Sequence, residues 1–152
     1  GLAQDPAEAV RWFRKAADQE QGGGLARINL GDCYKDGFGV AQDLAEAARW
    51  YRMAAEDGYA EAQFILGVCY AKGQGVARDP AGAVRWYRMA ADQGFIPAEF
   101  ALGICYENGE GVTQDLAEAV RWYRKAADQG EPDAKAALER LGKSPPPLTD
   151  KS

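Results

Sequence analysis

One ten-residue segment occurs four times along this chain of 152 residues, with only small changes between copies. The copies are RWFRKAADQE, RWYRMAAEDG, RWYRMAADQG and RWYRKAADQG, and they begin at residues 11, 49, 85 and 121. Successive copies are therefore 38, 36 and 36 residues apart. A repeat of this length is typical of a solenoid, in which each unit buries its apolar face only by stacking on its neighbours. The period thus predicts an extended array with a long surface, and argues against a closed active-site pocket.

Each unit has the pattern of two helices joined by a glycine-containing turn. In the third copy the first helix is predicted over Ala60–Lys72, because Ala62, Leu66 and Tyr70 recur one helical turn apart on one face. Gly73–Val76 then has the composition of a helix stop and tight turn. Glycine loops of this kind could also suggest phosphate binding. They recur once per unit and follow no predicted strand, so they are interpreted as turns.

The second helix of the unit begins at a capping aspartate. Asp79 is followed by Pro80, the pair expected at an N-cap and at the first helical position. The apolar residues after it recur in steps of one, three and four and are predicted to be buried: Ala83, Trp86, Tyr87, Ala90 and Ala91. The fold class predicted is therefore all-α, a solenoid of antiparallel helix pairs.

These signals divide the chain into a repeat array over residues 1–142 and a tail over 143–152. The array is predicted to contain a partial first repeat over 1–22, repeats over about 24–58, 60–94 and 96–130, and a capping helix over 132–142. In that last helix Glu139 replaces a glycine of the other copies, which gives the polar outer face that a terminal helix needs. The tail carries three consecutive prolines and is predicted to be disordered.

The first residues match the middle of a repeat. Gly1–Asp5 corresponds to Gly39–Asp43, so the helix expected before Gly1 is missing. This indicates a piece of a longer protein or an engineered array. Without that helix, Trp12 and Phe13 would lose their cover, and self-association through this N-terminal edge is a possible result.

One long pattern carries a family resemblance. The string A-x-x-x-L-G-x-C-Y-x-x-G-x-G-V-x-x-D-x-x-x-A-x-R-W-Y-x-x-A-A begins at Ala62 and at Ala98, and with small departures at Ala26. It resembles the Sel1-like repeat family, relatives of the tetratricopeptide repeats, over about residues 1–141. The resemblance implies a right-handed superhelix of antiparallel helix pairs. It also implies an adaptor or scaffold whose first helices line a concave groove that takes up partner segments.

The residue inventory argues against catalysis. The chain has no histidine, and its only serines are Ser144 and Ser152 in the tail. Ser-His and Cys-His nucleophile pairs and the usual zinc ligands are thereby excluded. We expect no enzymatic activity, no cofactor and no metal. A hydrolase built on paired carboxylates in a deep cleft stays open as an alternative.

The three cysteines, Cys33, Cys69 and Cys105, fall once per repeat. Equivalent positions in stacked helices lie about 10 Å apart, which exceeds the roughly 7 Å between Cα atoms that a disulfide allows. They are predicted to be buried free thiols that act as small hydrophobes. Free thiols favour a reducing compartment such as the cytoplasm, and a periplasmic or secreted location stays open because the N-terminus looks truncated.

The charge pattern limits the partners. The net charge of −5 argues against nucleic acid, which needs a basic face, and no apolar run approaches the length of a membrane span. The second helices carry paired arginines, such as Arg49 with Arg52. A glutamate often stands three residues before the first arginine, and an acidic residue such as Glu56 stands four after the second. This predicts a charge-balanced outer face; an anion-binding ladder is the alternative.

The face of the first helices that packing does not use is the candidate binding surface. Its residues vary between copies while the packing positions stay the same, which favours a surface free to specialise. The predicted peptide-binding groove is formed by Ile28, Asn29, Asp32, Lys35, Phe64, Val68, Lys72, Phe100, Ile104, Glu107 and Asn108. Its apolar members would receive side chains of a peptide or protein segment, and its polar members would fix direction and register. The alternatives are that the large apolar residues belong to the core, or that the chain is a spacer or self-assembly module with no groove ligand.

Overall fold

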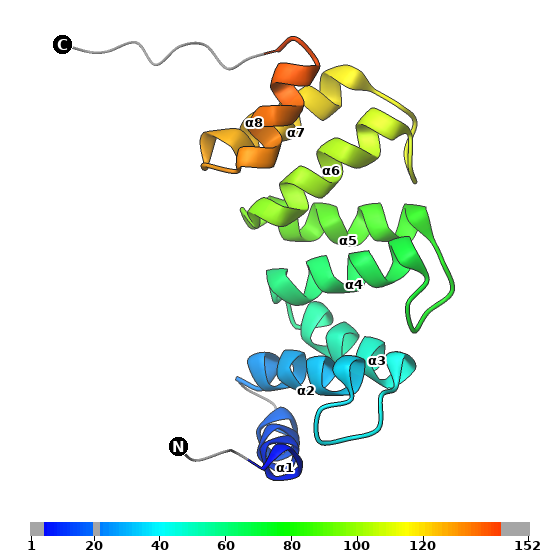
Figure 1. Ribbon diagram of the computed structural model, residues 1–152, viewed down its shortest axis with the longest axis vertical. Coiled ribbons are helices and arrows are strands. Elements are labelled where there is room, and N and C mark those ends of the chain that lie inside the picture. The colour runs from blue at the N-terminus through cyan, green and yellow to red at the C-terminus, as the bar shows by residue number, and fades with distance from the viewer. Residues whose placement is uncertain (1–4, 20–21, 144–152) are drawn as a thin grey trace, which may run out of the picture.

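The computed structural model describes residues 5–19 and 22–143, and all regular secondary structure within them is helical. The helices are α1 (Pro6–Ala17), α2 (Gly24–Asp36), α3 (Leu44–Glu56), α4 (Ala60–Lys72), α5 (Pro80–Asp92), α6 (Ile96–Asn108), α7 (Leu116–Asp128) and α8 (Pro132–Arg140). Each packs mainly on the helices before and after it, so the chain forms a stack with α1 at one end and α8 at the other (Figure 1). The predicted all-α solenoid of helix pairs is confirmed. The tail is predicted to be disordered. Its residues after Lys143 lie outside the described part of the chain.

The repeat alternates two kinds of helix. We call α2, α4, α6 and α8 the A helices, and α1, α3, α5 and α7 the B helices. The bounds of α4 are those predicted from the sequence. The B helices begin at the aspartates, whose carboxylates accept backbone N–H groups of the first turn: Asp79 accepts from Gly82 at 3.0 Å, and Asp115 from Glu118 at 3.1 Å. These bonds satisfy donors that a helix start otherwise leaves unpaired.

Within a pair, a glycine on the A helix lets the B helix approach closely. A Cβ atom at Gly67 would lie 2.6 Å from Cε1 of the Tyr87 ring, closer than two carbon atoms can pack. Tyr51 and Tyr123 lie against Gly31 and Gly103 in the same way. The buried tyrosine of each B helix therefore fills the space that the missing side chain leaves.

Between pairs, the loops after α2, α4 and α6 rest on the B helix of the preceding repeat. Gly75 has φ +73°, and a Cβ atom there would lie 2.0 Å from the Leu44 carbonyl oxygen. Only glycine accepts both this backbone conformation and this approach. The glycine loops are thus turns, as predicted from their recurrence, and they also stack one repeat on the next.

The tryptophans of the B helices lie at the same junctions. Trp50, Trp86 and Trp122 each pack against the apolar cluster of the preceding repeat, and all three are half-buried. The expectation that Trp86 is buried like Tyr87 is therefore only partly met. The indole spans the boundary between two repeats, so one of its edges stays open to solvent.

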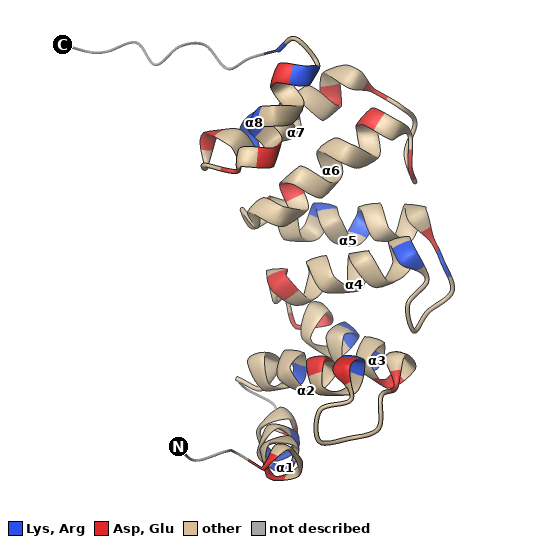
Figure 2. Ribbon diagram, viewed as in Figure 1, with Lys and Arg blue, Asp and Glu red and all other residues tan. Residues whose placement is uncertain are grey.

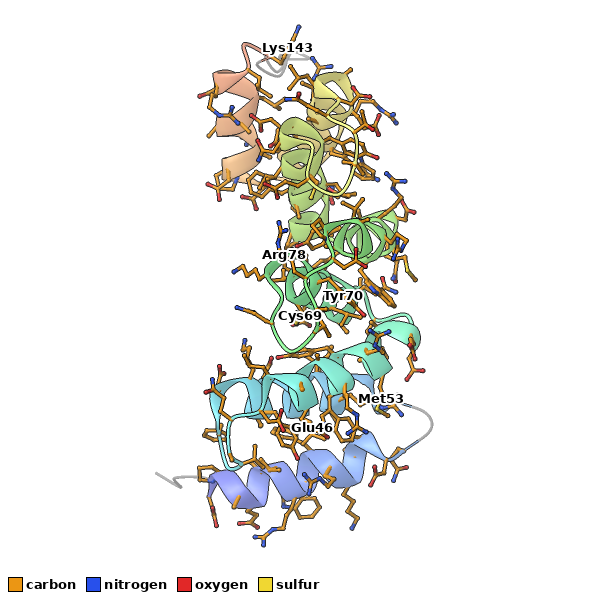
Figure 3. The ribbon with its side chains drawn as sticks, turned by 90° about the vertical axis from the view of Figure 1, so that its right-hand side faces the viewer. Glu46, Met53, Cys69, Tyr70, Arg78 and Lys143 are labelled. Atoms are coloured by element: carbon orange, nitrogen blue, oxygen red, sulfur yellow. The ribbon has the colours of Figure 1, made fainter. Side chains whose placement is uncertain are left out.

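In α1, α3 and α5, the second arginine of the pair crosses to the next repeat. Arg14, Arg52 and Arg88 donate hydrogen bonds to the hydroxyl groups of Tyr34, Tyr70 and Tyr106 on the following A helices. Figure 3 shows Tyr70 next to Cys69 on α4, and the Arg52 guanidinium lies 5.6 Å from the centre of the Tyr70 ring. The ion pair expected between Arg52 and Glu56 is not among those of the described residues, because the guanidinium is engaged by the tyrosine of the next repeat.

The cysteines occupy the apolar clusters. Cys33, Cys69 and Cys105 are free and buried, as predicted. Burial raises the pKa of the Cys105 thiol to about 11, and Glu110 adds to the rise. The thiolate that metal binding or redox chemistry needs is therefore disfavoured at this position.

Candidate interaction surface

The structure buries one of the predicted groove residues, Ile28, in the core. Ile28 has only 3% of its surface exposed and lies in the core cluster with Ala47 and Tyr51. The core alternative therefore holds for Ile28, and the expectation that it lines an open groove is wrong. Its branched side chain is short enough to end inside the cluster.

The equivalent phenylalanines are only half-buried. The Phe64 ring centre lies 5.7 Å from that of Tyr87 and 5.6 Å from that of Phe95, and Val68 packs on the same cluster. The ring of Phe100 lies 5.7 Å from that of Tyr123. These residues thus take part in packing and keep part of their surface in contact with solvent.

A hollow of about 520 Å³ forms where α6, α7 and α8 meet. Four predicted groove residues line it, all from α6: Phe100, Ile104, Glu107 and Asn108. Phe100 and Ile104 pack on the last core cluster and form its apolar part, whereas Asn108 is exposed. The structure therefore brings the predicted residues of the last complete repeat together in one concave place.

An ion pair borders this hollow. The Glu107 carboxylate accepts two hydrogen bonds from the Arg140 guanidinium, at 2.5 and 2.9 Å, and one from the Tyr123 hydroxyl at 2.6 Å. The bonds from Arg140, and after them the bond from Tyr123, hold the pKa of Glu107 below its usual value. Burial and the bond to Glu107 raise the pKa of Tyr123. Glu107 is thus an ionised, positioned carboxylate with much of its bonding capacity already used.

Sequence reasoning missed the contribution of α7 and α8 to this site. Tyr123, Asp133 and Arg140 also line the hollow. Arg140 lies 33 residues from Glu107, beyond any helical spacing rule. The one available signal was the departure of α8 from the repeat pattern, where arginine follows the glutamate that replaces the packing glycine.

The other predicted polar residues lie on α2 and α4. Asp32 accepts a hydrogen bond from the Tyr51 hydroxyl at 2.6 Å, so it supports the packing of α2 on α3. Asn29 is half-buried, and Lys35 and Lys72 are exposed near the ends of their helices. These three side chains lie outside the hollow at α8.

A second concave place lies on the outer side of α1. Its volume is about 330 Å³, and Trp12 and Phe13 line it together with Asp5 and Glu8. Trp12 is 63% exposed, whereas the equivalent Trp50, Trp86 and Trp122 are half-buried by a preceding repeat.

Charge does not gather on one part of the array. Figure 2 shows acidic and basic residues distributed along the whole stack. The described residues contain no group of three histidine, cysteine, aspartate or glutamate side chains placed to hold a metal ion. None of their helices is long and apolar enough to cross a membrane.

Known proteins share this architecture. The sequence-family model of the Sel1 repeat matches residues 1–20, 24–59, 60–95 and 96–131. A protective antigen of uropathogenic Escherichia coli with an SLR fold is 44% identical with a TM-score of 0.86; the match covers 90% of this chain and 29% of that one. A Sel1 repeat protein from Oxalobacter formigenes is 37% identical with a TM-score of 0.84, over 93% of this chain and 59% of that one.

A more distant structure shares the fold alone. Cysteine rich protein B of Helicobacter pylori is 23% identical with a TM-score of 0.66, over 91% of this chain and 98% of that one. No curated protein matches the chain. The chain spans less than two thirds of the length of the two more similar proteins. With four matched repeats over most of its length, the chain belongs to the Sel1 repeat family.

Proposed function

We propose that the chain is a non-enzymatic scaffold that binds a peptide or protein segment along its A helices, with the hollow at α6, α7 and α8 as the main contact. Sel1-repeat proteins are generally protein-interaction scaffolds. The observation that carries the proposal is the hollow itself, in which half-buried Phe100 and Ile104 lie beside exposed Asn108. Apolar side chains of the ligand would enter there, and Asn108 would pair with its backbone.

An extended segment suits this surface. Its alternate side chains point to opposite sides, so one set can enter apolar places while the backbone is hydrogen-bonded. Phe64 and Val68 would continue the apolar contacts towards the N-terminal end, and Lys35, Lys72 and Asn29 would fix direction and register. Asp32 and Glu107 contribute mainly by holding Tyr51 and Tyr123 in place, since their oxygens already accept those hydroxyl groups.

The test is a peptide-display selection on this chain with a variant that fills the hollow. Ala136 lines the hollow and is exposed, so Ala136→Arg blocks the site without removing a core side chain. We expect selected peptides to bind this variant about tenfold more weakly, a loss of about 1.4 kcal/mol. Ala81→Arg is the matched control, because Ala81 is an exposed helical alanine of α5 away from the hollow. Peptides that bind the parent chain and Ala136→Arg with equal affinity would contradict the proposal.

A second candidate is end-to-end self-association, favoured by the 63% exposure of Trp12. Trp12 and Phe13 of one molecule would pack on another copy. Sedimentation at increasing concentration should show association that Trp12→Lys removes and Met89→Lys, at an exposed position of α5, retains. Equal association of both variants would exclude this edge.

A hydrolase built on paired carboxylates needs two such groups whose pKa values are tuned apart within one cleft. In the described part of the chain, the two carboxylates with shifted pKa values lie in different places. Glu107 is paired with Arg140 at the hollow, whereas Glu99 is fully buried and bonded to Gln129. This separation favours the scaffold over the enzyme.

A further inference from the structure

Every complete repeat carries one polar pair that joins a buried or half-buried residue of its A helix to an exposed residue at the end of its B helix. Equivalent positions form the three pairs, which are Arg27 with Asp57, Gln63 with Gln93, and Glu99 with Gln129. The Gln93 amide donates to the Gln63 carbonyl oxygen at 2.9 Å, and the Gln129 amide donates to Oε2 of Glu99 at 2.6 Å.

In the first two pairs, the A-helix residue also binds the preceding repeat. Arg27 Nε donates to the Ala17 carbonyl at 3.1 Å, and Gln63 Nε2 donates to the Ala55 carbonyl at 3.2 Å. Both carbonyls belong to the second alanine of the Ala-Ala pair near the end of a B helix. The equivalent carbonyl for the third pair is that of Ala91. A side chain at this position therefore works as a donor between neighbouring repeats.

Glu99 occupies the donor position without a donor hydrogen in its ionised form. Glu99 is 0% exposed, and its Oε1 atom is buried with no hydrogen-bond partner. Leaving a buried polar atom unpaired is costly, and leaving a buried charge without full pairing costs more. A proton on Oε1 removes both costs, since a protonated carboxyl group carries one O–H donor.

We propose that Glu99 is a buried proton-binding site: its carboxyl group stays protonated in the folded array at neutral pH, and the O–H donates to the Ala91 carbonyl as the Gln63 amide does to Ala55. Gln129 continues to donate to Oε2 in this state. The proton takes the place that an amide or guanidinium hydrogen holds in the other two repeats.

The one charge close to Glu99 among the described residues favours the ionised form, but its effect is smaller than that of burial. From α7, the Lys125 ammonium lies 3.9 Å from Oε1, and its side chain is 52% exposed. On α5, Ala90 and Ala91 are fully buried, and Asp92 after them is exposed. Burial raises the pKa of Glu99 above its usual 4.5, while Lys125 and Gln129 act in the opposite direction with smaller effects. A half-exposed lysine beyond hydrogen-bond distance is screened by water, so burial prevails.

The sign of the pH dependence follows from this shift. In the unfolded chain Glu99 loses its proton near pH 4.5, whereas in the folded chain it keeps the proton to higher pH. Its contribution to stability is therefore complete below the unfolded pKa, and is lost as the pH rises through the folded pKa. The junction of α5, α6 and α7 therefore becomes weaker as the pH rises through the folded pKa of Glu99.

The test compares the parent chain with Glu99→Gln over a range of pH. Glutamine keeps the shape and donates at every pH. We expect the ratio of the unfolding equilibrium constants, parent over variant, to rise about tenfold per pH unit between the unfolded and folded pKa values of Glu99. Glu110→Gln is the control, because it makes the same substitution at an exposed position. A ratio for Glu99→Gln that does not change with pH overturns the proposal.

Two further measurements do not depend on the Glu99 variant. The carboxyl carbon of Glu99 in the parent chain should show the NMR shift of a protonated acid at neutral pH, and the shift of a carboxylate would overturn the proposal. Gln63→Glu places the same group at the equivalent position of α4. We expect this variant to become less stable with rising pH in the same way, and a pH-independent effect would count against the assignment.

Discussion

A single missing side chain sets the distance between the two helices of each pair. Because a Cβ atom at Gly67 would lie 2.6 Å from the Tyr87 ring, Gly67→Ala forces the ring or the helix to move. Alanine gains about 1 kcal/mol of helix propensity over glycine, but overpacking a filled core costs about 1–3 kcal/mol. We expect net destabilisation, measured as a lower midpoint of urea unfolding.

A double-mutant cycle checks the cause. If the Tyr87 ring is the obstacle, Tyr87→Leu should abolish most of the cost of Gly67→Ala. Equal costs in the presence and absence of the ring would show that the contact in the structure is not what makes glycine necessary.

Glu107 predicts a pH dependence opposite to that of Glu99, although both lie on α6. Hydrogen bonds from Arg140 lower the pKa of Glu107, so its contribution is present above the unfolded value of 4.5 and is lost as the pH falls through the folded value. Glu107→Gln should therefore melt at a lower temperature than the parent chain at neutral pH. The difference should close on acidification. Melting temperatures measured down the acid range test this, and a difference that persists below the folded pKa would contradict it.

For a whole helix, the N-cap residue is the feature whose effect on the free energy of unfolding is clearest. The Asp115 carboxylate accepts the Glu118 N–H at the beginning of α7, and the loss of such a cap costs about 1 kcal/mol. We expect Asp115→Ala to lower the free energy of unfolding by about this amount, and Asp115→Asn to retain most of it. Chemical denaturation measures both, and equal losses in the two variants would show that charge, rather than capping, matters there.

Helices could be predicted from the sequence because their signals are local. The bounds of α4 follow from the alanine, leucine and tyrosine spacing and from the glycine after Lys72. Contacts between repeats could not, since Arg52 meets Tyr70 of the next A helix instead of an acidic residue on its own helix. The burial of Ile28 could not be predicted either. Its position in the repeat is that of Phe64, but its smaller side chain is enclosed by the core.

The molecule as a whole depends on how tightly each repeat is coupled to the next. Gly75 touches the Leu44 carbonyl with its backbone, so Gly75→Ala combines a strained φ with a direct clash at the junction of two repeats. In a solenoid, stability is close to a sum of repeat and junction energies. We expect this variant to unfold in two steps, with the N-terminal repeats separating from the C-terminal ones.

Hydrogen exchange resolved along the chain would detect the separation. As denaturant is added to Gly75→Ala, the hydrogen-exchange protection of α1–α3 and that of α4–α8 should be lost at different concentrations. In the parent chain both parts should lose protection together. Unfolding of the variant in one cooperative step, with uniform loss of protection, would show that this junction is not what couples the two parts.

The same loops have a consequence for measuring the array. The second glycine of each loop makes the contact with the neighbouring repeat. The residue between the two glycines, Phe38, Gln74 or Glu110, is exposed in each loop. That middle residue can be exchanged without touching the junction. Probes attached at these three places would be spaced one repeat apart along the array. The distances between them would report whether the superhelix lengthens or tightens when a partner binds.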